Sequence, residues 1–247
     1  MTAASVAQAA DNNARWCDAV CSSHGVPGVF LDSHWLNRFN VPRFYPNAVM
    51  LAPTQPADER RPCIDEQVAQ AIPAAAAVKD SFLALNLAPF GFQVAFHATW
   101  IARAPTLPKP DGAETGIVWG AVQNAAELAR WEAAWSGVTG HDPALKSGRI
   151  FLPSLLGHAG VAFFAAYRGR QIVAGVIANS TSGVVGLSNV FVPNDRVQSF
   201  LAGGVGAVMD AFPRLPLVGY ERGSDLVTAR ALGFEELGPL RVWTRAN

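Results

Sequence analysis

The sequence predicts an α+β fold, built on a mixed, mostly antiparallel twisted sheet with helices on both faces. Residues 161–245 alternate between short apolar, β-branched runs and amphipathic stretches, in the order strand, strand, strand, helix, strand, helix, strand. A helix joins the third strand to the fourth, and a helical crossover between neighbouring strands makes them parallel. We therefore expect one parallel pair, where residues 186–192 meet residues 215–220.

Composition indicates a globular chain with a sizeable core. The chain has 247 residues, of which 50% are apolar, enough for one large domain or two small ones. Its 19 basic and 19 acidic residues balance, which argues against nucleic acid or an anionic membrane as a partner. The start lacks a signal-peptide pattern, and no apolar run approaches the roughly 18 residues of a membrane span. We expect a cytoplasmic protein, and the sequence leaves a homodimer open.

The cysteines and histidines predict no metal site. The chain has three cysteines, an odd number: Cys17, Cys21 and Cys63. Its five histidines lie in different segments and lack the spacing of metal ligands. Cys17 and Cys21 can share a helix face, so a chelate is conceivable. Buried free thiols in a reducing compartment are the favoured interpretation.

The N-terminal part begins with a segment expected to be frayed, residues 1–12. A helix is predicted over residues 14–23, because its apolar residues share one side and a glycine follows. Residues 35–46 are aromatic and irregular, which makes this segment a candidate for one wall of a pocket. A strand is predicted over residues 48–52.

Residues 78–87 are predicted to form an amphipathic helix, followed by Gly91, Phe92 and an alternating strand. The chain ends on the same order, a helix, Gly233, Phe234 and a strand. A single similarity of this kind can also arise from ordinary helix C-cap chemistry, without duplication. The similarity suggests that the N-terminal part is a partial copy of the C-terminal lobe.

The clearest linker is residues 104–116, which hold three prolines and two glycines. We place a partial lobe over residues 1–105, the linker over 106–116 and a full domain over 117–247. In that domain, residues 117–122 are predicted as a strand, 125–135 as a helix and 150–157 as a short helix.

The third strand of the C-terminal unit leads into a candidate anion site. Pro193 ends the strand because it has no N–H to donate, and Asn194 and Asp195 are good helix N-caps. Apolar residues then recur at helical spacing over residues 197–212. The free N–H groups at the start of such a helix attract an anion such as a pyrophosphate.

This order of elements, closed by Leu232, Gly233 and Phe234, resembles the GNAT superfamily of acyl-CoA-dependent N-acyltransferases. The resemblance covers roughly the last half of the chain. In the pyrophosphate loop Pro193 and Arg196 match the family pattern, whereas Val197 and Ser199 stand where glycines are usual.

The resemblance implies acetyl-CoA, or another acyl-CoA, as the cofactor. In the family the strand before the loop pairs with the pantetheine arm through its backbone, and the loop amides face the pyrophosphate. By position, the strand residues are Val190 and Val192, and the loop residues are Arg196, Val197, Gln198 and Ser199.

Candidate acid and base residues are few. The fourth strand of the GNAT order carries no carboxylate here, so Glu221 is the nearest candidate for the general base. It stands beside Arg222, and an exposed ion pair is the competing interpretation. The position where the family often has a tyrosine acid is Ala229, and Tyr220 is a poor substitute by position.

Three functions remain open. The first is transfer of an acyl group from acyl-CoA to the primary amine of a small molecule or amino acid. The second is a catalytically degenerate GNAT-fold protein that binds or regulates, which the missing glycines, base and acid favour. The third is a relative of the two-lobed aminoacyl transferases, suggested by the internal similarity and opposed by the neutral charge.

Overall fold

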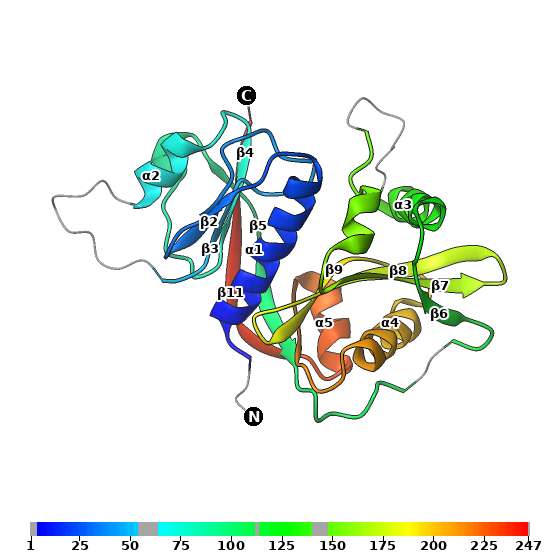
Figure 1. Ribbon diagram of the computed structural model, residues 1–247. Helices are drawn as coiled ribbons and strands as arrows, with labels where there is room; N and C mark the ends of the chain where they lie inside the picture. The colour runs from blue at the N-terminus through cyan, green and yellow to red at the C-terminus, as the bar shows by residue number, and fades with distance from the viewer. Residues whose placement is uncertain (1–3, 54–63, 112–113, 140–147, 247) are drawn as a thin grey trace.

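The computed structural model describes residues 4–53, 64–111, 114–139 and 148–246, and Figure 1 shows their arrangement. The helices are α1 (Val6–Ser23), α2 (Ile64–Ala71), α3 (Ala125–Thr139), α4 (Val197–Ala211) and α5 (Gly223–Ala231), with 3-10 helices η1 (Ala88–Phe90) and η2 (Pro153–Gly157). The strands are β1 (Val29–Phe30), β2 (His34–Leu36), β3 (Ala48–Met50), β4 (Ala76–Asp80), β5 (Gln93–Arg103), β6 (Val118–Ala121), β7 (Val161–Arg168), β8 (Gln171–Thr181), β9 (Val184–Phe191), β10 (Leu217–Glu221) and β11 (Glu235–Arg245).

Within these described residues the strands form a single 11-stranded sheet, in the order β1-β2-β3-β4-β11-β5-β10-β9-β8-β7-β6. Strands β9 and β10 run parallel and most other neighbours run antiparallel, so the predicted fold class and the predicted parallel pair are confirmed. Helices α4 and α5 pack on one face of the C-terminal strands, and α1, α3 and η2 pack on the other.

The sheet is nearly symmetric about its central pair, β11 and β5. On one side β3, α2 and β4 form a parallel strand-helix-strand unit, and on the other side β9, α4 and β10 do the same. Each unit leads to a glycine with positive φ, +80° at Gly91 and +85° at Gly233, and then to a strand of 11 residues. This repetition supports the interpretation that the N-terminal part is a partial copy of the C-terminal lobe.

The two halves of the chain exchange their last strands. Strand β5, from the N-terminal part, lies between β10 and β11, and β11 pairs with β4. Strands from before and after the linker predicted at residues 106–116 therefore belong to one continuous sheet. The division into residues 1–105 and 117–247 stays a prediction, since a continuous sheet is compatible with two lobes that fold together.

Helix α1 begins earlier than predicted. Residues 1–12 were expected to be frayed, but the helix starts at Val6, where Ser5 caps it and Gln8 closes a capping box with Ser5. Ser5-x-x-Gln8 is the sequence signature of such a box. The helix crosses the middle of the molecule (Figure 1), and Asn12 Nδ2 donates to the carbonyl of Asn179 at 2.8 Å. It therefore joins the N-terminal part to the C-terminal strands.

The prediction of an amphipathic helix over residues 78–87 is wrong. Its first residues belong to strand β4, which pairs with β3 and β11, and the Asp80 carboxylate then accepts from the N–H groups of Ala84 and Leu85 at 2.9 and 3.1 Å. Arg241 donates to the same carboxylate at 2.9 Å. Pairing with two distant strands outweighs the helical spacing of the apolar residues.

Two glycines inside α4, Gly203 and Gly204, lie close to the Trp119 side chain. A Cβ atom at Gly203 would collide with the indole of Trp119 in β6. These small residues let α4 approach the sheet, so their role is structural.

No helix in the described ranges is long and apolar enough to cross a membrane.

Candidate functional site

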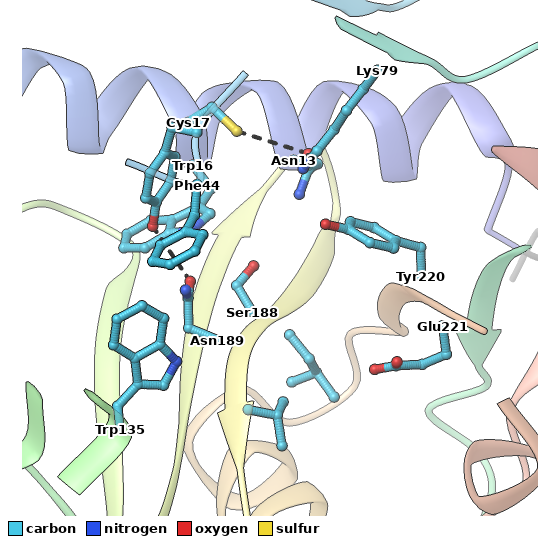
Figure 2. Close-up of a pocket in the computed structure, with 13 residues that line it drawn as sticks. Asn13, Trp16, Cys17, Phe44, Lys79, Trp135, Ser188, Asn189, Tyr220 and Glu221 are labelled. Atoms are coloured by element: carbon cyan, nitrogen blue, oxygen red, sulfur yellow. Dashed lines mark hydrogen bonds between the residues drawn. The ribbon is translucent and has the colours of Figure 1, made fainter. Parts of the chain in front are cut away.

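The candidate site is the opening between β9 and β10. The two strands pair only where Val185 meets Leu217 and Gly186 meets Val218, and beyond these residues they separate. The gap leads into a cavity of about 350 Å³, into which side chains of α1, β4 and the loop at residues 44–45 also project (Figure 2). Its lining is Asn13, Trp16, Cys17, Phe44, Tyr45, Lys79, Trp135, Leu187, Ser188, Asn189, Val190, Tyr220 and Glu221.

A β-bulge lies where β9 parts from β10. Asn189 and Val190 together oppose one residue of β8, and Asn189 has a φ of 51°. Asparagine tolerates this left-handed conformation better than most residues, and a bulge bends and twists its strand. Tyr45 Oη donates to Asn189 Oδ1 at 3.4 Å, so the N-terminal half contacts the bulge directly.

Glu221, the predicted general base, lies at the end of β10 and lines the cavity. Its partial burial, assisted by the negative charge of Asp225, raises the pKa of the Glu221 carboxyl to about 7. The competing ion pair with Arg222 does not form, because the Arg222 guanidinium carbon lies over the Phe96 ring, 4.5 Å from its centroid. A carboxyl with this pKa takes up and releases protons near neutral pH.

Lys79 is a site residue that the sequence reasoning missed, because residues 78–87 were predicted as helix. It is only 8% exposed, and its Nζ donates to Asn13 Oδ1 at 2.8 Å and lies 4.8 Å from the centroid of the Tyr220 ring. Burial by itself lowers the pKa of Lys79, but the neighbouring Tyr220 and Cys17 side chains raise it more.

Tyr220, judged a poor candidate by position, also lines the cavity. Its hydroxyl and that of Ser188 point into the same space as the Lys79 ammonium (Figure 2). The signal that could have placed Lys79 here was the internal repeat. Lys79 precedes the end of β4 by one residue, as Tyr220 precedes the end of β10.

Aromatic rings form the opposite wall, as predicted for residues 35–46. Phe44 lies 5.8 Å from Trp135, and Trp16 lies 6.3 Å from Tyr45, between ring centroids. Phe44 has a φ of 72° and is 55% exposed. Trp35 is buried elsewhere and donates to Asp18 at 3.0 Å, so its role is packing.

The predicted cofactor residues separate into two groups. Val190 lines the cavity, and Val192 follows the end of β9. The other four form the N-terminus of α4 and border a separate open hollow: Arg196, Val197, Gln198 and Ser199.

The N-terminus of α4 already has an acidic neighbour. Arg196 forms an ion pair with Glu114, and Ser199 Oγ donates to the same carboxylate at 3.2 Å. Asp195 lies 3.7 Å from the Arg196 guanidinium. A helix N-terminus attracts anions, and here the Glu114 carboxylate of the chain itself lies against the Arg196 and Ser199 side chains at that end of the helix.

The two thiols that the structure describes are both buried. Cys17 and Cys21 are free and buried, as predicted, and burial raises the pKa of both thiols, that of Cys21 to about 12. They are therefore poor nucleophiles. Cys63 lies outside the described residues. In the part of the chain that the structure describes, no group of three metal-binding side chains gathers.

Solved structures with the same architecture include a GCN5-related N-acetyltransferase from Kribbella flavida, with a TM-score of 0.59 at 16% identity, covering 95% of each chain. An acetyltransferase of the GNAT family from Colwellia psychrerythraea has a TM-score of 0.50 at 12% identity, covering 100% of this chain and 99% of its own. A GCN5-related N-acetyltransferase-like protein from Streptococcus suis has a TM-score of 0.50 at 11% identity, covering 96% and 100%. No protein-family model and no curated protein sequence matches the chain.

The chain therefore has the GNAT fold. The likeness extends over nearly the whole length of both chains, so these structures share the N-terminal half as well as the C-terminal lobe. The resemblance found at the end of the sequence is confirmed at the level of the fold.

Proposed function

We propose that the protein is an acyl-CoA-dependent N-acyltransferase, which moves an acyl group to the primary amine of a small molecule or amino acid. The observation that carries this proposal is the parting of β9 from β10 beside Glu221. In the described residues no strand pairs with this edge of β9 beyond Gly186, so its backbone groups can pair with an amide-containing chain. The unpaired edge fits the pantetheine arm of acyl-CoA.

The phosphates would lie at the N-terminus of α4. Helix N–H groups and the Arg196 guanidinium there suit a pyrophosphate, provided that the Glu114 carboxylate moves aside. The backbone at Val190 and Val192 would hold the arm. Acyl-CoA would therefore fit in two places, as the resemblance implies. Of these two places, only the N-terminus of α4 has to exchange a partner, the Glu114 carboxylate.

Glu221 is the residue that we assign as general base. When bound, acyl-CoA would supply a thioester whose carbonyl carbon an amine can attack: the N–C bond forms, the C–S bond breaks, and CoA leaves as the thiolate, which takes up the second proton that the amine nitrogen loses. Amines are protonated at neutral pH and must lose a proton first. The Glu221 carboxylate, with a pKa of about 7, can accept that proton inside the cavity.

The experiment is titration calorimetry with acetyl-CoA, followed by an assay of thiol release with a panel of small amines. Saturable binding and amine-dependent thiol release would support the proposal. Binding to the native state alone also raises stability, by about 2.7 kcal/mol at a ligand concentration of 100 times Kd. Failure of acetyl-CoA and of longer acyl-CoAs to bind would refute it.

A specific observation favours a second candidate, a GNAT-fold protein that binds or regulates without catalysis. Glu114 engages Arg196 and Ser199 at the place where a pyrophosphate would bind. Under this alternative the ion pair is permanent and acyl-CoA does not bind. The same calorimetry separates the two candidates.

A further inference from the structure

We propose that the acceptor is an α-amino acid with an apolar side chain, and that Lys79 binds its carboxylate. This inference rests on the proposed function for the acyl donor and names the substrate class of the same cavity. It is carried by a buried cation, by the hydroxyl groups around that cation and by the aromatic wall opposite.

The Lys79 ammonium has no anionic partner in the described part of the chain. No carboxylate oxygen there lies within 4.0 Å of its Nζ, and it donates a hydrogen bond to the neutral amide oxygen of Asn13. Burying a charge is unfavourable unless a counter-charge compensates it. Because Lys79 lines an open cavity rather than a closed core, a bound anion can supply that counter-charge.

The surroundings of Lys79 suit a carboxylate. The hydroxyls of Tyr220 and Ser188 point into the same space from β10 and β9 (Figure 2), and each can donate to a carboxylate oxygen. The Glu221 carboxylate enters the cavity from another side, below Tyr220 in Figure 2. An acceptor with a carboxylate and an amine would therefore place the carboxylate at Lys79 and the amine toward Glu221.

The aromatic wall sets the third point of contact. Trp16, Phe44 and Trp135 lie across the cavity from Lys79 and Glu221 in Figure 2. Phe44 combines an exposed ring with a φ of 72°, a conformation that is strained for a bulky residue. Such strain gathers at binding sites, where a ring must be held in one orientation. A cavity of about 350 Å³ is at the small end of ligand sites, as an amino acid requires.

The test compares matched acceptors with the wild-type protein. L-phenylalanine and phenethylamine differ only in the carboxylate, as do L-leucine and 3-methylbutylamine. Charge-assisted hydrogen bonds predict that each amino acid has a kcat/KM about tenfold to a hundredfold above that of its amine. Lys79→Met should abolish this preference and Lys79→Arg should keep part of it. Lys109→Met, at an exposed lysine paired with Asp210, is the matched control and should leave the preference unchanged.

The outcomes separate this inference from the proposed function. If acetyl-CoA binds and the amines are acylated as well as the amino acids, the inference is wrong and the acyltransferase proposal stands. If acetyl-CoA does not bind, calorimetry with L-phenylalanine and phenethylamine alone still decides. Tighter binding of the amino acid supports a carboxylate site, and equal or no binding overturns it. Should Lys79→Met fail to fold, the wild-type comparison decides by itself.

Discussion

Glu221 is the residue on which the proposed chemistry depends, and it makes the reaction pH-dependent. The carboxylate form accepts the proton, so the rate should rise with pH through about 7, the pKa of this group. Glu221→Gln cannot accept a proton and should lower kcat about a hundredfold or more, with unchanged acetyl-CoA affinity. Steady-state assays from pH 5.5 to 8.5 would check this. An unaltered pH profile in Glu221→Gln would remove Glu221 from the mechanism.

The same carboxyl predicts a change in stability. Its folded-state pKa of about 7 lies above the ordinary value of about 4.3, so its contribution to stability is fully present below about pH 4.3 and is lost as pH rises through about 7. Glu221→Gln removes the buried negative charge. We expect the variant to be more stable than wild type at pH 8.5, by of order 1–2 kcal/mol, and similar near pH 4.5.

Urea unfolding at the two pH values measures this difference. Asp210→Asn, at an exposed aspartate paired with Lys109, serves as a control for the loss of a negative charge. A variant that is equally stabilised at both pH values would show that burial does not set the pKa of Glu221.

At the scale of the element, the proposed function makes the N-terminus of α4 the place that sets acetyl-CoA affinity. Glu114 holds Arg196 and also repels any phosphate that approaches the helix, so Glu114→Gln should strengthen acetyl-CoA binding, about twofold to tenfold. Arg196→Ala should weaken it about tenfold. A charged contact to phosphate is worth roughly 1.5 to 3 kcal/mol, and this side chain is half-exposed, which favours the lower end.

Calorimetry on both variants and the wild type checks this prediction. Equal affinities in all three proteins would move the phosphates away from α4. Binding by Glu114→Gln alone would mean that the ion pair blocks the site in the wild-type protein.

The elements of the C-terminal lobe could be predicted from sequence because their signals are local. Pro193 ends a strand, the apolar spacing after it marks a helix, and Gly233 marks a helix end, so β9, α4 and β11 were found and Glu221 with them. Strand β4 could not be found in this way. The partners that make residues 76–80 a strand lie in β3 and β11, and such pairing leaves no local pattern.

Lys79 was missed for the same reason, whereas the start of α1 was missed without need. The capping box formed by Ser5 and Gln8 is a local signal that the sequence displays. Separation of β9 from β10 is different again. This separation depends on a bulge at Asn189. An asparagine tolerates positive φ in many settings, so its presence in the sequence does not predict a bulge.

At the scale of the whole molecule, the exchange of β5 and β11 makes the two halves depend on each other. Strand β5 belongs to residues 1–105, yet it pairs on both sides with strands of residues 117–247. Strand β4 loses its β11 partner if the chain is divided. Dividing the chain would therefore leave strand edges from the middle of the sheet without partners. It would also leave each fragment with only part of its hydrophobic core.

We expect that residues 1–105 and residues 117–247, expressed separately, each lack a cooperative thermal transition. Mixed in equal amounts, they should regain one, because the β5 contacts with β10 and β11 can form between two chains as they do within one. Circular dichroism melts of each fragment and of the mixture measure this. A cooperative melt of residues 1–105 alone would mean that the N-terminal half is an independent domain. The cavity, which takes Lys79 from one half and Glu221 from the other, would then be an interface between domains rather than part of one folding unit.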